Sequence, residues 1–329
     1  MYISSVLLSQ DAVFSQYFAS GVYFNPALAA TETSLTISGI TRVQWKSINS
    51  SFNTSMLALT VPVKDKFEKH KRLAGATLSY YDDKSSDNIL HTQGLNAAFS
   101  YGFMFSEKNI LFLGGQVGWF TTRVDTDQFI WGSDLASLVL PSDFDSQLEL
   151  LSNSSYIDVS AGFLAVHDLK KKVGTDRSEI YFGGAFYHLN RPNQSIVKED
   201  ISNLPLRMNY NLGAIFPLRE NIGISPNFLF VQQSQKNQFN TGVYLSYYFL
   251  NQEGEGFVPN NIELGSWYRF GDSFIFNIGL GNEVYHLGFS YDLTTSNLKY
   301  TSGGNNAYEI SFKIQKPHKK SERHYTPRF

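Results

Sequence analysis

The sequence has no cysteine, few charged residues and no long apolar run. Without cysteine the chain has no disulfide framework, no thiolate nucleophile and no cysteine-ligated metal. Charged residues make up 17% of the 329 residues, against about 25% in an ordinary soluble domain. No stretch approaches the ~18 consecutive apolar residues of a membrane-spanning helix. A helical membrane protein is therefore excluded, and the net charge of −2 gives no reason to expect a nucleic-acid partner.

Aromatic residues and glycine are what the chain has in quantity, with 15% aromatics and 25 Gly. Few charges, many aromatics and no long apolar run together indicate a chain rich in β-strands. The mean hydropathy of −0.21 still permits a membrane barrel, because half of the residues in each spanning strand face the interior and can be polar.

Apolar and polar side chains alternate with a period of two along most of the chain. In 307–314, for example, Tyr308, Ile310 and Phe312 share one face, while Glu309 and Ser311 take the other. Helical spacing is not sustained anywhere. The pattern predicts strands at 33–46, 50–61, 72–83, 92–105, 109–122, 155–166, 178–189, 206–217, 221–234, 237–250, 260–270, 273–281, 284–293 and 307–314.

These runs have the length of membrane strands, which need ~9–11 residues to cross a bilayer, whereas soluble strands average ~5–6. An even number of strands suits a closed antiparallel barrel, which leaves no unpaired edge in lipid. A large soluble β-protein would alternate as well, but here the polar faces are rich in Gly, Ser and Asn rather than Lys and Glu. We therefore expect an all-β fold, a transmembrane antiparallel β-barrel of the outer membrane with about 14 strands. Aromatic girdles are expected near strand ends at Trp45, Trp119, Trp131, Trp267 and Tyr268.

Connection lengths suggest how the chain is organised. The long gaps 123–154, 190–205 and 294–306 follow odd-numbered strands, and outer-membrane barrels place long loops outside. This parity predicts that both termini lie in the periplasm. We divide the chain into a remnant of a signal peptide (1–9), an N-terminal periplasmic segment (10–32), the barrel (33–314) and a basic periplasmic tail (315–329).

Short motifs follow one another along residues 10–329 and contain Asn25, Pro26, Arg42, Trp45, His188, Arg191, Pro192, Asn193, Arg207, Arg269, Tyr291, Asp292, Gly303, Gly304, Pro327, Arg328 and Phe329. In these motifs and in their order, the chain resembles the PorP/SprF family of the type IX secretion system. Ala12, Ala30 and Thr326 depart from the expected pattern, in which Pro, Gly and Cys stand at these positions; the last departure weakens any tail role that needs a thiol.

The resemblance implies an outer-membrane component of the secretion and gliding machinery. In that role the barrel supports export or surface anchoring of an adhesin-like cargo with a type B C-terminal sorting domain. The implied partners are outer-membrane lipid, the secreted cargo and periplasmic components of the apparatus. The alternative is a porin or substrate-specific channel, although the few charges on inward faces suggest a filled lumen.

Several of the same residues have plain physical interpretations. Asn25 and Pro26 predict a turn before the first strand, because Pro fixes its φ. Arg191 either clamps a carboxylate or pins its loop to the barrel wall. Asp292, on an inward face, is expected to pair with Arg207 or Arg269, in a network that either keeps the barrel rigid or binds a ligand.

The sequence offers little for catalysis. The seven His are scattered and lack zinc-ligand spacing, and neither a nucleophile elbow nor a phosphate-binding loop is present. A Ser–His pair assembled across strands, as in a barrel hydrolase, leaves no motif. We expect no enzyme activity, no cofactor and no metal.

Overall fold

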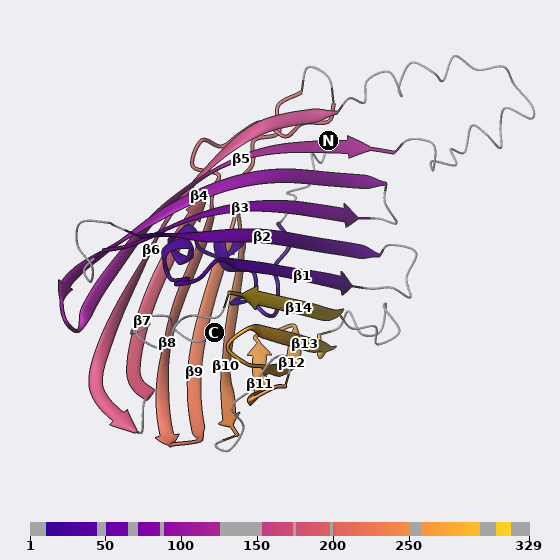
Figure 1. Cartoon of the computed structure of the whole chain (residues 1–329). Coiled ribbons are helices and arrows are strands. Elements are labelled where there is room, and N and C mark those ends of the chain that lie inside the picture. The colour runs from indigo at the N-terminus through magenta and orange to yellow at the C-terminus, as the bar shows by residue number, and fades with distance from the viewer. Residues whose placement is uncertain are drawn as a thin grey trace, which may run out of the picture.

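The computed structural model describes residues 11–44, 51–64, 72–85, 89–125, 153–173, 176–197, 200–249, 258–296 and 307–316. Within them, consecutive strands pair antiparallel, and the first strand closes against the last to form a barrel (Figure 1). The strands are β1 (Thr36–Gln44), β2 (Phe52–Lys64), β3 (Arg72–Ser85), β4 (Leu90–Ser106), β5 (Asn109–Val124), β6 (Ser154–Val173), β7 (Asp176–Tyr187), β8 (Arg207–Arg219), β9 (Ile222–Gln233), β10 (Lys236–Tyr248), β11 (Asn261–Arg269), β12 (Ser273–Gly281), β13 (Tyr285–Thr294) and β14 (Ala307–Gln315). The predicted fold class and each predicted strand are confirmed.

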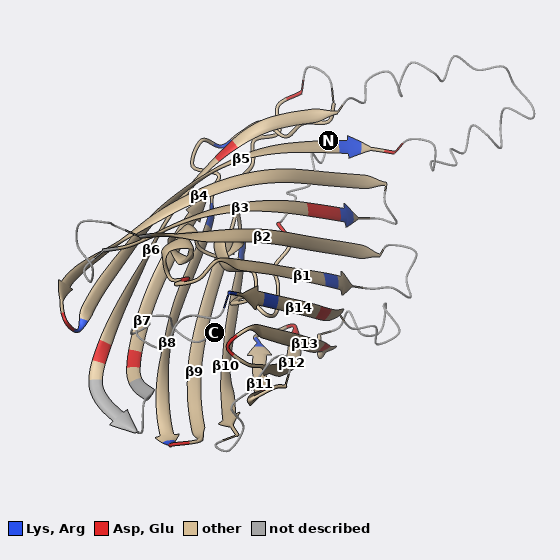
Figure 2. Cartoon of the chain, in the orientation of Figure 1, with Lys and Arg blue, Asp and Glu red and all other residues tan. Residues whose placement is uncertain are grey.

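The two faces of the wall differ as a lipid-facing barrel requires. On β12, Ser273, Ile275 and Asn277 point inward and are buried, while Phe274 and Phe276 point outward and are 45% and 50% exposed. Because most of these outward side chains are apolar, the outer wall suits hydrocarbon. Charged residues gather near the strand ends and the connections (Figure 2). Other exposed outward residues are Leu57, Leu59, Val61, Leu78, Leu95, Val117, Leu264, Leu287, Phe289 and Ile310.

The connections define two ends of the barrel. We call the end with the connections 125–153, 188–206 and 295–306 the long-loop end, and the end with 107–108, 174–175 and 220–221 the short-turn end. Asp11 contacts residues at the long-loop end, whereas Lys316 follows β14 at the short-turn end. The first and last described residues therefore lie at opposite ends of the barrel. Residues 1–10 and 317–329 lie outside the described residues, so the periplasmic position of both termini stays a prediction.

One local expectation was wrong. Trp267 does not belong to an outer girdle: it points into the lumen, is 2% exposed, and packs edge-on against Tyr17. Trp267 and Tyr268 are adjacent on one strand, so they point to opposite faces and only Tyr268 can belong to the outer girdle. Trp119 and Tyr268 do face outward, while Trp45 and Trp131 fall outside the described residues.

Residues 11–31, which we call the plug, lie inside the barrel rather than ahead of it as a separate periplasmic segment. The plug contains two short 3₁₀ helices, η1 (Gly21–Tyr23) and η2 (Pro26–Ala30). Its side chains join four inward-facing clusters of the barrel wall, with Phe14, Tyr17 and Ala27 all at most 2% exposed. Within the described ranges, no helix is long and apolar enough to cross a membrane.

Candidate functional site in the barrel lumen

The turn of the plug forms where the sequence predicted one. Asn25 caps η2 by accepting a hydrogen bond from the backbone N–H of Ala27 at 2.9 Å, and Pro26 occupies the first helical position, where its missing N–H costs nothing. The Asn25 amide also donates to the backbone carbonyl of Phe163 on β6 at 2.9 Å. The two residues therefore shape the plug and attach it to the wall.

Glycines in the wall admit the plug backbone. A Cβ atom on Gly114 of β5 would lie 2.5 Å from the backbone nitrogen of Ala27, and one on Gly75 of β3 would lie 1.9 Å from the carbonyl oxygen of Ala29. Real Cβ atoms do not approach that closely, so only glycine allows η2 to lie against these strands. Hydrogen bonds to plug carbonyls complete the attachment: Ser100 donates to Ala27 at 2.9 Å and Tyr187 to Val22 at 2.8 Å.

A buried charged cluster holds the first turn of the plug near the long-loop end. Arg42 on β1 forms ion pairs with Asp292 on β13, at 2.9 Å, and with Glu309 on β14. Arg269 on β11 also contacts Asp292, at 3.2 Å. Ser15 of the plug donates its hydroxyl to Asp292 at 2.7 Å and accepts hydrogen bonds from both arginines, at 2.6 and 2.9 Å.

Glu309 binds the plug through its backbone. Its two carboxylate oxygens accept hydrogen bonds from the N–H groups of Ser15 and Gln16, at 2.6 and 2.8 Å. The pairing of Arg42 opposite Glu309 in the β1–β14 register sets this geometry. Two arginines and two carboxylates make the group electrically neutral, which is the condition for burying such charges. We call these five residues, Ser15, Arg42, Arg269, Asp292 and Glu309, the Ser15 cluster.

A second group, the Asp11 cluster, consists of Asp11, Asp158, His188 and Arg207. The Asp11 carboxylate lies 2.8 Å from Nε2 of His188 and 2.9 Å from Arg207. Nδ1 of His188 lies 2.9 Å from Asp158 on β6. The Arg207 guanidinium lies over the rings of Tyr23 and Tyr187, at 4.7 and 4.2 Å from their centroids, a favourable position for a cation.

His188 has a φ of 60°, in the left-handed region that non-glycine residues rarely adopt. The turn places its imidazole between two carboxylates. Burial alone would lower the pKa of His188, but the Asp11 charge and the hydrogen bonds that the imidazole donates to both carboxylates raise it to about 9. Burial likewise opposes ionisation of Asp11, yet His188 and Arg207 hold its pKa well below the usual range. The ion pairs of this cluster are therefore formed at neutral pH.

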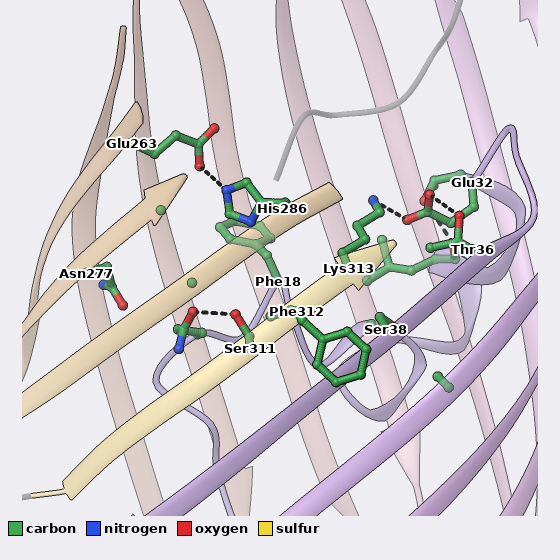
Figure 3. A pocket seen from close by; sticks show the side chains of 18 of the residues that line it. Phe18, Glu32, Thr36, Ser38, Glu263, Asn277, His286, Ser311, Phe312 and Lys313 are labelled. Atoms are coloured by element: carbon green, nitrogen blue, oxygen red, sulfur yellow. Dashed lines mark hydrogen bonds and ion pairs between the residues drawn. The ribbon is translucent and has the colours of Figure 1, made fainter. Parts of the chain in front are cut away.

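Between the plug and the short-turn end, the lumen contains a chamber of about 110 Å³ that both polar and apolar side chains line (Figure 3). Phe18 and Leu28 of the plug form part of its lining, opposite the strand side chains. On one side Lys313 pairs with Glu32 at 2.7 Å, and on the other His286 lies 3.4 Å from Glu263. The described residues contain no group of three or more His, Asp or Glu that could hold a metal ion.

The family model described as type IX secretion system membrane protein PorP/SprF matches residues 6–314. The chain belongs to the PorP/SprF family. This protein is thus an outer-membrane component of the type IX secretion system, and family membership accords with a role that is not enzymatic. No curated protein matches this PorP/SprF chain in sequence.

Among solved structures, this PorP/SprF barrel is similar to outer-membrane channels. It matches a deltaS2S3 mutant of the TodX monoaromatic hydrocarbon channel with a TM-score of 0.50 and 9% identity, covering 91% of this chain and 94% of that one. A Pseudomonas aeruginosa FadL homologue matches with a TM-score of 0.47 and 11% identity, covering 90% and 94%. At such identities the likeness concerns the fold alone.

The two clusters bring together five of the residues that the sequence singled out, with His188 and Arg207 in the Asp11 cluster. Arg42, Arg269 and Asp292 meet in the Ser15 cluster, so one expected pairing of Asp292, with Arg269, is present. The other, with Arg207, is absent because Arg207 pairs with Asp11 instead. Tyr291 points outward, away from Asp292.

The loop after β7 is attached to β6 by Asn190 rather than by Arg191: Asn190 accepts a hydrogen bond from the backbone N–H of Val159 at 3.1 Å and donates one to the carbonyl of Ile157 at 2.6 Å. Within the loop, Asn193 joins two of its segments. Asn193 accepts hydrogen bonds from the backbone N–H groups of Ser195 and Ser202, at 3.0 and 2.8 Å, and Pro192 is buried. The Arg191 side chain is exposed and makes no ion pair with the part of the chain that the structure describes. The PorP/SprF motif residues Trp45, Gly303, Gly304, Pro327, Arg328 and Phe329 lie outside the described residues.

Asp11, Ser15, Asp158 and Glu309 are the residues of the two clusters that sequence reasoning missed. Glu309 carried a usable signal: alternation put it on the polar face of the last strand, and closure of the barrel puts that strand beside Arg42. The contacts of Asp11 and Ser15 carried none, because nothing in the sequence shows that the N-terminal segment folds back into the lumen.

Proposed function

We propose that this PorP/SprF barrel supports export or surface anchoring of an adhesin-like cargo that carries a type B C-terminal sorting domain. The observation that carries the proposal is the family match over residues 6–314. The filled lumen is consistent with it, since residues 11–31 occupy the space that a diffusion pore would need. In this role the barrel acts by binding proteins at its two ends.

The proposal includes an orientation. Long loops are typically external, so the long-loop end would face the cell surface and bind the cargo. Lys316 and the basic tail 317–329 would then lie in the periplasm, available to ring components of the apparatus. Removing residues 317–329 is expected to leave the barrel inserted and to abolish co-purification of periplasmic partners. Unchanged partner recovery would reject this part of the proposal.

The direct test is secretion of a reporter fused to a type B sorting domain, in a strain that lacks the protein. We expect the reporter to accumulate in the periplasm, and export to return when the wild-type gene is restored. A reporter with a type A sorting domain is the matched control and should be exported in both strains. Normal export of the type B reporter in the deletion strain would contradict the proposal and favour the porin alternative.

A further inference from the structure

The chamber below the plug contains a buried amide that lacks hydrogen-bond partners. Asn277 on β12 lines the chamber (Figure 3) and is 7% exposed. Neither its Nδ2 nor its Oδ1 atom makes a hydrogen bond within the described part of the chain. A buried polar group without a partner costs free energy, so such a group in a native lumen calls for an explanation. A bound ligand provides one.

A carboxylate lies beside this amide. Glu263 on β11 pairs in register with Gly279, two residues from Asn277 on β12, and both side chains face the chamber. Its nearest basic neighbour is His286, whose Nε2 lies 3.4 Å away, a distance longer than the ~2.7–2.9 Å of a charge-assisted hydrogen bond. Glu32, by contrast, has Lys313 at 2.7 Å. Glu263 is therefore the less neutralised of the two chamber carboxylates.

The same wall also presents an aromatic ring. Tyr244 on β10 lines the chamber and leans over Gly265, where a Cβ atom would lie 2.4 Å from its ring. Tyrosine rings attract cations over their faces. A carboxylate, an amide oxygen and an aromatic ring are together the partners of a guanidinium, whose five donors form a flat fork and which stacks on rings.

We propose that Glu263, Asn277 and Tyr244 form a binding site for the guanidinium of an arginine side chain carried on a peptide. The site does not depend on the export role and lies in the half of the lumen next to the short-turn end. Two sources of such a peptide fit its place. The chain's own tail carries Arg323 and Arg328 beyond Lys316, which lies at this end. A basic segment of another protein has the same chemistry.

The test is calorimetric titration of the purified full-length barrel in detergent micelles with N-acetyl-arginine amide. The citrulline amide is the matched probe, because it keeps the shape and lacks the charge. We expect the arginine amide to bind at least tenfold more tightly than the citrulline amide, and its affinity to fall as salt is raised. Equal binding of the two probes would overturn the site.

Variants locate the binding. Glu263→Gln should weaken binding of the arginine amide at least tenfold, and Asn277→Ala should weaken it as a second, independent change. Glu283→Gln is the matched control, since Glu283 is exposed in the turn after β12 and should bind as the wild type does. Heat-modifiable migration on gels checks that each variant is folded. Unchanged affinity in folded Glu263→Gln and Asn277→Ala would overturn the proposal.

A variant with Arg323→Gln and Arg328→Gln distinguishes the two sources. If the tail fills the site, this variant binds the arginine amide more tightly than the wild type does. If another protein fills it, the two bind alike. Either result supports the site. If the arginine amide bound neither the wild type nor this variant, the proposal would be overturned.

Discussion

Arg42 is 2% exposed, yet two carboxylates and a hydroxyl surround its guanidinium. Each buried charge in such a group is stabilised by the opposite charges around it, so removing one residue leaves another charge buried without its partner. The Ser15 cluster links three parts of the molecule. The two strands that close the barrel, β1 and β14, and the first turn of the plug share one set of ion pairs and hydrogen bonds. The Ser15 cluster thus ties closure of the barrel to seating of the plug.

Replacing Arg42 with Met should therefore lower the free energy of unfolding by about 3–5 kcal/mol, because Glu309 is left buried without its cation. Urea unfolding in detergent micelles measures the change. Arg219→Met is the control, since Arg219 is exposed at the end of β8 and should change stability by less than about 0.5 kcal/mol. Equal effects of the two substitutions would show that the cluster contributes nothing.

The Asp11 cluster predicts a pH dependence. Because the pKa of His188 is raised to about 9, its ion pairs contribute fully below the ordinary pKa of about 6.5 and are lost as pH rises through 9. The wild type should exceed His188→Gln in stability by about 1–3 kcal/mol at pH 6, and the difference should shrink by pH 9.5. If the stability difference between the wild type and His188→Gln stayed constant from pH 6 to pH 9.5, the imidazole of His188 would not be charged in the folded protein.

At the scale of elements, the period of two in the sequence predicted the strands well, because contact with lipid requires apolar side chains at every second position. Each strand has one face in hydrocarbon, so outward positions such as Phe274 and Phe276 are apolar and the period of two is plain. Inward side chains follow no such pattern of polarity, because some of them contact other strands across the lumen and others contact the plug. Trp267 was misplaced outside for that reason.

The plug itself could not be predicted from local sequence. Gly75 and Gly114 read as ordinary strand glycines, and only the folded barrel shows that η2 lies against them. The contacts between Ser15 and Asp292 or between Asp11 and Arg207 join residues that are about 200 or more positions apart in sequence. Asp292 and Arg207 are recognisable in the sequence as motif residues, but nothing in the sequence shows that they contact Ser15 and Asp11.

Substituting Gly114 with Val should displace η2, because the new side chain would meet plug backbone rather than a flexible side chain. We expect a loss of about 1–3 kcal/mol in stability, together with faster hydrogen exchange of residues 11–31. Gly115→Val is the adjacent control, since a Cβ atom there meets nothing within 4 Å. Similar exchange in both variants would mean that the plug does not need the glycine opening.

At the scale of the whole molecule, the outer face decides where the barrel resides. Ile278, at the middle of β12 and 42% exposed, should tolerate Arg poorly, with a cost of about 2–4 kcal/mol near the bilayer midplane. Ile201, in the connection after β7 and 73% exposed, should tolerate the same change without measurable cost. Refolding into lipid vesicles compares the two. Equal stability of both variants would contradict a lipid-facing wall.

The plug fills the lumen of the barrel, and in the proposed function the protein works through its two ends rather than through a pore. Single-channel recording of the refolded protein in planar bilayers tests this most directly, with Gly114→Val as a variant expected to open the lumen. The wild type should show no steady open-pore conductance, and Gly114→Val should show discrete openings. A stable, ohmic open pore in the wild type would contradict the account and return the protein to the channel class.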